Sequence, residues 1–194
     1  MLKRVLCSFT VPALALCASL AIPGAASAKS SADRFALLPL VAGDTGMPYQ
    51  VFPSPTERSE LGGRLEHQVM QRNGGDAIAP ARVEHAVATA GFDQNSAYRA
   101  CNDAQCARRI GRRLHVDTVV YGSVTRYMAM IWGTEVSLVD VASGKVQGPY
   151  SLGYKGDYAS LSAGVDELAQ SLSQTLVADA AARNRARTTV ATHR

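Results

Sequence analysis

The sequence predicts an α/β fold, an α+β sandwich in which helices pack on a mixed sheet of about five strands. Three observations lead to this prediction. A short apolar run near residue 35 is typical of a strand buried on both faces. Stretches with the helical spacing of apolar residues follow it. Three segments rich in valine, tyrosine and threonine then indicate successive strands, before a last stretch of helical spacing.

The first 28 residues are typical of a secretory signal peptide. Lys3 and Arg4 precede an apolar run from Val5 to Leu20, and Ala26-Ser27-Ala28 has the small-x-small pattern of a cleavage site. We therefore expect a protein that is exported to the periplasm and keeps no transmembrane segment after cleavage. Cys7 and Cys17 each follow a leucine, whereas a lipoprotein signal has a small residue before the acylated cysteine, so a soluble product is favoured over a lipid-anchored one.

Cleavage after residue 28 would leave 166 residues, a length that suits one domain. We expect a single α/β domain over residues 29–182. Residues 183–194, in which arginines alternate with small polar residues, are predicted to be a disordered basic tail. The exported part has 18 basic and 16 acidic residues, a formal charge of +2, which is too even to predict nucleic-acid binding.

Two cysteines remain after cleavage, Cys101 and Cys106. In an oxidising compartment we expect them to form a disulfide that fixes a turn before a helix. A metal pair or a redox pair is less favoured. Zinc would need two further ligands, and redox-active pairs usually have two intervening residues rather than four.

The predicted elements follow in chain order. The first strand is Phe35–Val41, within which Pro39 would deny the ladder one donor, and a glycine- and proline-containing loop follows over residues 42–53. Ser54 and Glu57 form a capping-box pattern that begins a helix with apolar residues at every fourth position. Within that helix, Gly62-Gly63 indicates close packing against a neighbour or a local break.

A short strand is expected over Asp76–Ala79, and Pro80 begins a second helix that ends at Gly91. Asn102 or Asp103 caps a third helix, whose apolar stripe lies opposite four arginines. Three antiparallel strands are then predicted, the last two joined by a hairpin turn with Gly144, and a long closing helix ends the domain. The predicted strands are Thr118–Tyr127, Met130–Val141 and Val146–Tyr154, and the closing helix contains Leu161, Val165, Leu168, Leu172 and Leu176.

One stretch of the chain carries a family resemblance. A helix that ends in Ile110-Gly111 is followed by Leu114-His115-Val116-Asp117 and by the strand Val119-Val120-Tyr121-Gly122-Ser123-Val124. This resembles the signature of the TolB amino-terminal-like fold, which includes curli-secretion proteins and lipoprotein activators of penicillin-binding proteins. The resemblance covers residues 35–176 and implies the fold, whereas the propeller of TolB and the membrane hairpins of the curli pore have no counterpart here.

The sequence contains no recognised catalytic motif. A phosphate-binding glycine loop, a Gly-x-Ser-x-Gly elbow and a histidine-glutamate zinc helix are all missing from it. His67 and His85 fall outside the apolar stripes of their helices and are expected to face solvent, and His115 is expected to cap the third helix. We therefore predict a protein that is not an enzyme and needs no cofactor or metal. A hydrolase would need a serine or aspartate with a histidine close by.

Three candidate surfaces could bind a partner. The first is the loop with Met47, Tyr49 and Phe52, and the second is the apolar group around Tyr127 and Trp132, which could equally be core. The third is the helix face with four arginines, which could contact an anionic membrane surface or an acidic protein, or could simply be a solvated face. Those arginines are Arg108, Arg109, Arg112 and Arg113.

These surfaces lead to two hypotheses about function. The first is an exported, non-enzymatic accessory protein that binds another cell-envelope protein. The alternative is a periplasmic protein that binds a small molecule in a cleft between the 42–53 loop and the sheet.

Overall fold

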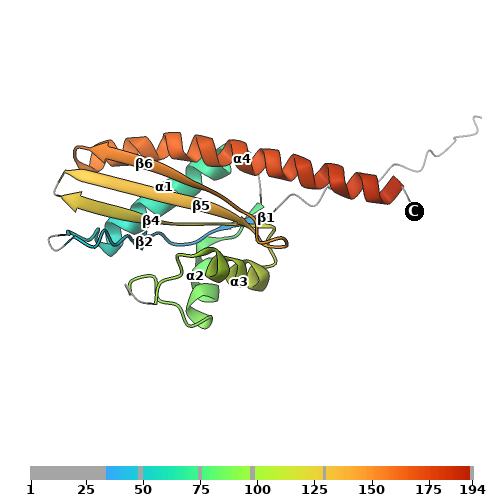
Figure 1. Ribbon diagram of the computed structural model, residues 1–194, viewed down its shortest axis with the longest axis horizontal. Coiled ribbons are helices and arrows are strands. Elements are labelled where there is room, and N and C mark those ends of the chain that lie inside the picture. The colour runs from blue at the N-terminus through green and yellow to red at the C-terminus, as the bar shows by residue number, and fades with distance from the viewer. Residues whose placement is uncertain (1–33, 48–49, 74–75, 97–98, 129, 193–194) are drawn as a thin grey trace, which may run out of the picture. The chain divides into compact units, whose positions relative to one another are not determined.

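The sheet and its helices form the α/β arrangement that the sequence predicts. The computed structural model describes residues 34–47, 50–73, 76–96, 99–128 and 130–192, so the expected signal peptide lies outside the described residues. Within these ranges the strand order is β3-β1-β4-β5-β6, with helices on both faces of the sheet (Figure 1). The fold class is therefore confirmed.

The sheet is mixed because it contains both parallel and antiparallel strand pairs. β1 (Arg34–Leu37) pairs in parallel with β3 (Asp76–Ala77) and with β4 (Thr118–Met128). The antiparallel strands β5 (Ile131–Asp140) and β6 (Val146–Lys155) then extend the sheet through short turns. These last three strands match the predicted ranges to within one residue at each end.

The predicted first strand is two strands, β1 and β2 (Val41–Ala42), which both pair with β4. The strand is interrupted at Pro39, which lies between them, because proline has no N–H to donate to the ladder. The N–H of Leu38 still donates to the carbonyl of Val120 at 2.9 Å, so the interruption is short. Phe35 and Ala36 are buried on opposite faces, which confirms that this strand is covered on both sides.

One face of the sheet is covered by α1 (Pro55–Asn73) and α4 (Tyr158–Thr192). The capping box at the start of α1 is confirmed, because the N–H of Glu57 donates to Ser54 Oγ at 3.1 Å and the N–H of Ser54 donates to Glu57 Oε2 at 2.7 Å. Leu61, Leu65 and Val69 of α1 are buried against the sheet and α4.

The other face is covered by α2 (Pro80–Thr89) and α3 (Ala104–Leu114). The side chain of Asp103 caps α3 by accepting from the N–H of Cys106 at 2.8 Å. Cys101 and Cys106 form the expected disulfide, with their Cα atoms 5.6 Å apart and both residues buried in this second core. The bridge therefore holds the turn that leads into α3.

α4 is longer than predicted. The segment expected to be a disordered basic tail continues the helix, which reaches Thr192. Between Gly164 and Thr192 the sequence contains no glycine or proline, and alanine and arginine, which are frequent there, favour helix. Arg183 Nη1 also donates to Asp140 Oδ2 at 3.1 Å, which attaches this part of α4 to the end of β5.

Candidate functional site

The predicted recognition loop lies between β2 and α1, and its described residues have no regular secondary structure. Met47 and Phe52 expose about half of their surface, 50% and 53% respectively. Tyr49 lies outside the described residues. These large apolar side chains face solvent, and a role for them in recognition stays a prediction.

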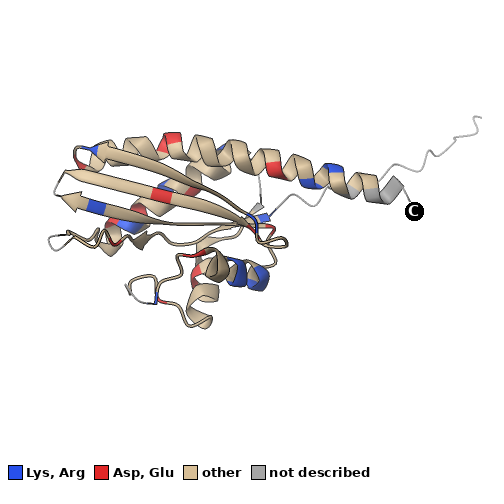
Figure 2. Cartoon of the chain, in the orientation of Figure 1, with Lys and Arg blue, Asp and Glu red and all other residues tan. Residues whose placement is uncertain are grey.

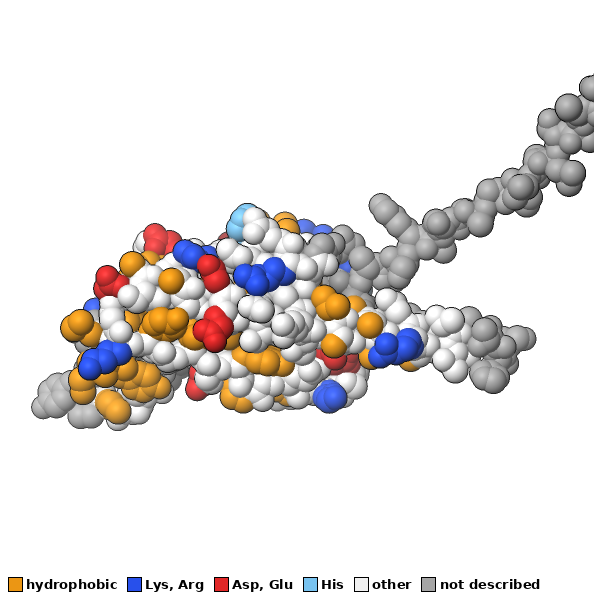
Figure 3. Space-filling view, turned by 90° about the horizontal axis from the view of Figure 1, so that it is seen from above, with side chains coloured by type: hydrophobic (Ala, Val, Ile, Leu, Met, Phe, Trp, Pro, Cys, Tyr) orange, Lys and Arg blue, Asp and Glu red, His pale blue; other side chains and the backbone are white. Residues whose placement is uncertain are grey.

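The apolar group near the turn between β4 and β5 divides into two sets. Met128, Met130 and Ile131 are exposed, and hydrophobic side chains gather at the left end of Figure 3, where β4 ends and β5 begins. Trp132 is only 2% exposed and packs in the core beside the ring of Tyr158, at 5.9 Å between centroids. Because alternate residues of a strand face opposite ways, Trp132 points toward α1 and α4. Trp132 is therefore core and is withdrawn as a partner-binding residue, whereas Tyr127, at 37% exposure, stays a candidate.

The four arginines of α3 do not form one uniform face, although Figure 2 shows positive charge concentrated on this helix. Arg108 is bound to the turn after β5, where its Nε donates to the carbonyl of Val141 at 2.8 Å and its Nη2 to that of Ala142. The guanidinium of Arg109 lies over the ring of Phe92, 5.8 Å from its centroid. Arg112 and Arg113 are exposed and remain accessible to a partner.

The histidines behave as expected. His67, His85 and His115 are all exposed, and His115 caps α3 in a left-handed conformation with φ 54°, its own N–H donating to the carbonyl of Arg112. Among the described residues, no group of three or more His, Cys, Asp or Glu is placed to hold a metal ion. None of the helices in the described ranges is long and apolar enough to span a membrane.

A pocket of about 730 Å³ lies at the carboxyl end of β1, between α1 and α2, and we call it the edge pocket. Its position follows from the path of the chain. β1 leads to α1 on one face of the sheet, whereas β3 leads to α2 on the other face. Helices that leave neighbouring parallel strands toward opposite faces open a crevice at the carboxyl ends of those strands, the usual place for a ligand in such sheets.

The wall that α1 contributes includes two adjacent glycines, Gly62 and Gly63. A Cβ atom added at Gly62 would lie 3.9 Å from Leu40 Cγ, and one added at Gly63 would meet nothing within 4 Å. Both glycines line the pocket, and α1 runs through them without a break. The pocket is therefore open where α1 lacks side chains, and this glycine pair is the one sequence signal that could have revealed it.

The floor of the edge pocket is apolar. It combines the end of β1 and the segment after it with α2 and the loop after α2. The apolar residues that line it are Leu37, Pro39, Leu40, Pro55, Val83, Val87, Ala88 and Phe92. None of the described residues between 42 and 53 lines it, so this pocket lies between α1 and α2 and not under the described part of the recognition loop.

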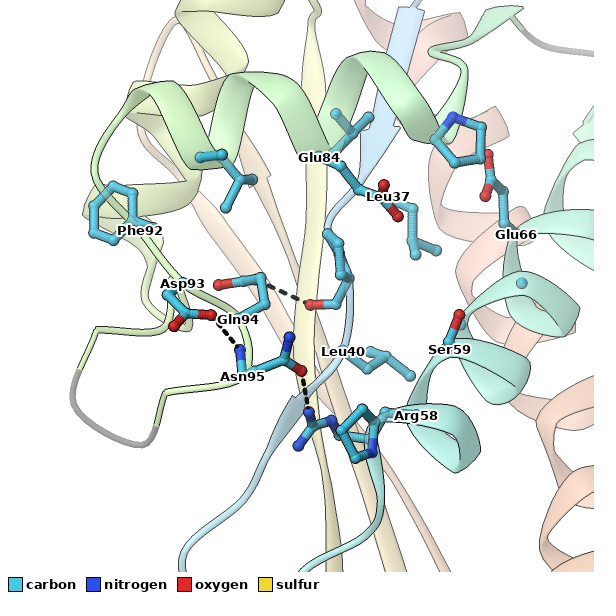
Figure 4. A pocket seen from close by; sticks show the side chains of 18 residues that line it. Leu37, Leu40, Arg58, Ser59, Glu66, Glu84, Phe92, Asp93, Gln94 and Asn95 are labelled. Atoms are coloured by element: carbon cyan, nitrogen blue, oxygen red, sulfur yellow. Dashed lines mark hydrogen bonds between the residues drawn. The ribbon is translucent and has the colours of Figure 1, made fainter.

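One buried cation lies at the pocket wall. Arg58 on α1 is 6% exposed, and its Nη2 donates to Asn95 Oδ1 at 2.7 Å across the pocket (Figure 4). Its Nε atom is buried and has no hydrogen-bond partner among the described residues. Desolvation lowers the pKa of the Arg58 guanidinium from its usual value.

The loop that carries Asn95 is itself held in place. The N–H of Asn95 donates to Asp93 Oδ1 at 2.9 Å, and Gln94 Nε2 donates to the carbonyl of Pro39 at 3.0 Å. Gln94 Oε1 also accepts from the N–H of Cys101 at 2.6 Å, which links the loop to the disulfide. This wall of the pocket is therefore fixed before any ligand arrives.

Negative charge predominates around the pocket. Glu66 projects from α1, Glu84 from α2 and Asp93 from the loop, against the single cation Arg58 (Figure 4). Burial raises the pKa of the Glu66 carboxyl, as expected of a carboxylate that is partly removed from water. The arrangement can hold an apolar group that carries or adjoins positive charge.

Comparison with known proteins gives likeness in structure only. No protein-family model and no curated protein matches the chain. Among solved structures, the LpoB C-terminal domain from Salmonella enterica is 13% identical with a TM-score of 0.45, and the match covers 68% of this chain and 87% of that one. Lipoprotein GNA1162 from Neisseria meningitidis is 17% identical with a TM-score of 0.48, and the match covers 72% of this chain and 99% of that one.

TolB from Acinetobacter baumannii is also similar to this chain. It is 13% identical with a TM-score of 0.41, and the match covers 77% of this chain and 28% of TolB.

Proposed function

We propose that this chain is an exported, non-enzymatic accessory protein that binds a segment of another cell-envelope protein in the edge pocket. Export is supported by the signal-peptide pattern of residues 1–28. The single observation that carries the binding role is the open, apolar edge pocket between α1 and α2 with its surplus of carboxylates.

The chemistry of the pocket defines the segment that it accepts. The floor suits one large apolar side chain, because Leu37, Leu40 and Val83 offer it no hydrogen-bonding groups. Glu66, Glu84 and Asp93 at the wall favour lysine or arginine next to that anchor. The bound segment is therefore an apolar anchor residue flanked by basic residues.

The pocket lining supports binding rather than hydrolysis. Ser59 is the one hydroxyl-bearing residue in the lining, and histidine, cysteine and lysine do not occur among the described residues that line the pocket. A nucleophilic serine needs a base within hydrogen-bonding distance. The described histidines are exposed on α1, α2 and the end of α3, outside this lining.

The test begins with a photo-crosslinking residue placed at Ser59, in cells that export the protein. We expect covalent capture of an envelope protein through a peptide that has an apolar residue beside lysine or arginine. The same crosslinker at Gln71, an exposed position of α1 outside the pocket, is the control. Equal capture of the same peptide at Gln71, or capture of acidic peptides at Ser59, would contradict the proposal.

A second step ties the captured peptide to the pocket. Gly63→Leu places a side chain in the opening and replaces a residue that disfavours helix, so the fold is kept. We expect it to weaken binding of the synthetic peptide by about tenfold or more, because the anchor side chain loses its place. Gln71→Leu, which adds the same side chain outside the pocket, should leave the affinity unchanged.

Binding of a small molecule is the second candidate function. The volume of about 730 Å³ is in the range of pockets that hold small ligands. A cationic, partly apolar metabolite that raises the melting temperature of the wild-type protein, but not of Gly63→Leu, would favour it over peptide binding.

A further inference from the structure

A second hollow lies between α2 and α3, away from the edge pocket. It has a volume of about 520 Å³, and we call it the basic hollow. Different faces of α2 line the two cavities. Val83 and Val87 line the edge pocket, whereas Arg82 and His85 line the hollow. Arg113 of α3 completes the basic rim, and the apolar floor includes Leu114.

The rim of this hollow carries uncompensated positive charge. α2 and α3 together contain five arginines and a single acidic residue, Glu84, which lines the edge pocket instead. Elsewhere in the described chain, Arg64 is paired with Asp166 at 3.0 Å and Arg183 with Asp140 at 3.1 Å. Acidic residues do not occur among the described residues that line the hollow, so its positive charge favours an external anion.

The basic hollow also lies beside the end of the domain at which the expected signal peptide joins. The N–H of Asp117, two residues after the cap of α3, donates to the carbonyl of Arg34 at 2.8 Å, and the N–H of Arg34 donates to Asp117 Oδ2 at 3.0 Å. In the sequence, five residues separate the expected cleavage site from Arg34.

We propose that the basic hollow docks the protein on the anionic phospholipids of a bilayer. Phosphate oxygens of the headgroups would contact Arg82 and Arg113. The arginine side chains on the rim are long and exposed, which suits a fluid layer of headgroups better than one rigid ligand. This membrane contact is separate from the partner segment in the edge pocket.

The experiment measures flotation of the purified protein with vesicles of phosphatidylglycerol and phosphatidylethanolamine at low salt. We expect binding to these vesicles, weaker binding in high salt, and none to neutral phosphatidylcholine vesicles. The double variant Arg82→Gln/Arg113→Gln should reduce the partition coefficient by about tenfold or more, because each basic residue near an anionic surface contributes to binding.

Two matched controls separate the hollow from net charge. Arg72→Gln/Arg185→Gln removes the same charge from exposed positions of α1 and α4, and it should change partitioning by less than about twofold. Thr89→Glu puts a carboxylate into the hollow and should reduce binding, whereas Thr89→Gln should not. An equal loss in the Arg72/Arg185 control would overturn the proposal. So would equal binding to neutral vesicles, or retention by an acidic polypeptide without any vesicle binding.

Discussion

Asn95 Oδ1 accepts a hydrogen bond of 2.7 Å from Nη2 of Arg58, a buried cation that no carboxylate pairs with among the described residues. Burial of a charge without an ionic partner is costly, and its hydrogen bonds offset only part of that cost. The fold therefore depends on the 93–95 loop, because its Asn95 side chain accepts a hydrogen bond from the buried Arg58 guanidinium at the wall of the edge pocket.

The first prediction concerns this pair. Asn95→Ala should lower the free energy of unfolding by about 1–3 kcal/mol, because the buried guanidinium loses its acceptor. Asn95→Asp puts a carboxylate in the same place and should restore or raise stability. Urea denaturation followed by circular dichroism measures both. A stability of Asn95→Ala equal to that of wild type would mean that Arg58 finds water or another acceptor.

The second prediction contrasts two helical glycines. Gly63→Ala should raise the free energy of unfolding by about 0.5–1 kcal/mol, since the added methyl group meets no atom within 4 Å and alanine favours helix. Gly111→Ala should lower it by about 1–3 kcal/mol, because the same methyl group would press on Val141 and lie 2.7 Å from Val119 Cγ2. Equal effects of the two changes on the denaturation midpoint would show that α3 is not packed as tightly as described.

The third prediction concerns the disulfide. Its loop is short, so reduction should cost about 2 kcal/mol in the free energy of unfolding and should leave the fold intact. We expect the loss to appear first near α3, because Cys106 lies in its first turn and Gln94 ties Cys101 to the edge pocket. Hydrogen exchange with and without reductant measures this. Uniform loss of protection over the whole sheet would contradict a local role.

The fourth prediction concerns pH and the end of α4. Burial acts to raise the pKa of Asp140, but hydrogen bonds from Ser143 and the nearby charge of Arg183 lower it by more, so the pKa is below its usual value. A carboxylate with a lowered pKa stabilises the fold above its unfolded pKa of about 3.9, and that contribution disappears as the pH falls through the folded pKa.

Asp140→Asn should therefore lower the free energy of unfolding at pH 7 by about 1–3 kcal/mol. The difference from wild type should shrink as the pH falls below about 4. Glu167→Gln, at an exposed position of α4, is the control and should be neutral at both pH values. A destabilisation that is equally large at pH 3 would show that Asp140 acts by packing and not by charge.

Local signals predicted most of the secondary structure. Ser54 with Glu57, Asp103 and Pro80 are helix-start residues whose effect depends on near neighbours in sequence, and each begins its helix where expected. The prediction of a disordered tail over residues 183–194 was wrong, because a polar composition does not exclude a helix. The helix propensity of its alanines and its contact with Asp140 outweigh that composition.

The candidate sites were harder to predict, because they depend on which face of an element is covered. Alternation along β5 places Trp132 and Ile131 on opposite sides, but sequence alone could not say that α1 and α4 cover the side of Trp132. The lining of the edge pocket comes from four segments spread over residues 37–95, and only the Gly62-Gly63 pair hinted at it.

The sequence by itself determined where most helices and strands begin, the pairing of Cys101 with Cys106 and most of the order of elements, because these follow from capping, periodicity and short-range chain geometry. Only the tertiary structure decided that Arg108 is tied to the turn after β5 while Arg113 borders an open hollow, and that a pocket opens beside Gly63. Those outcomes depend on contacts between residues far apart in the chain, which no local pattern encodes.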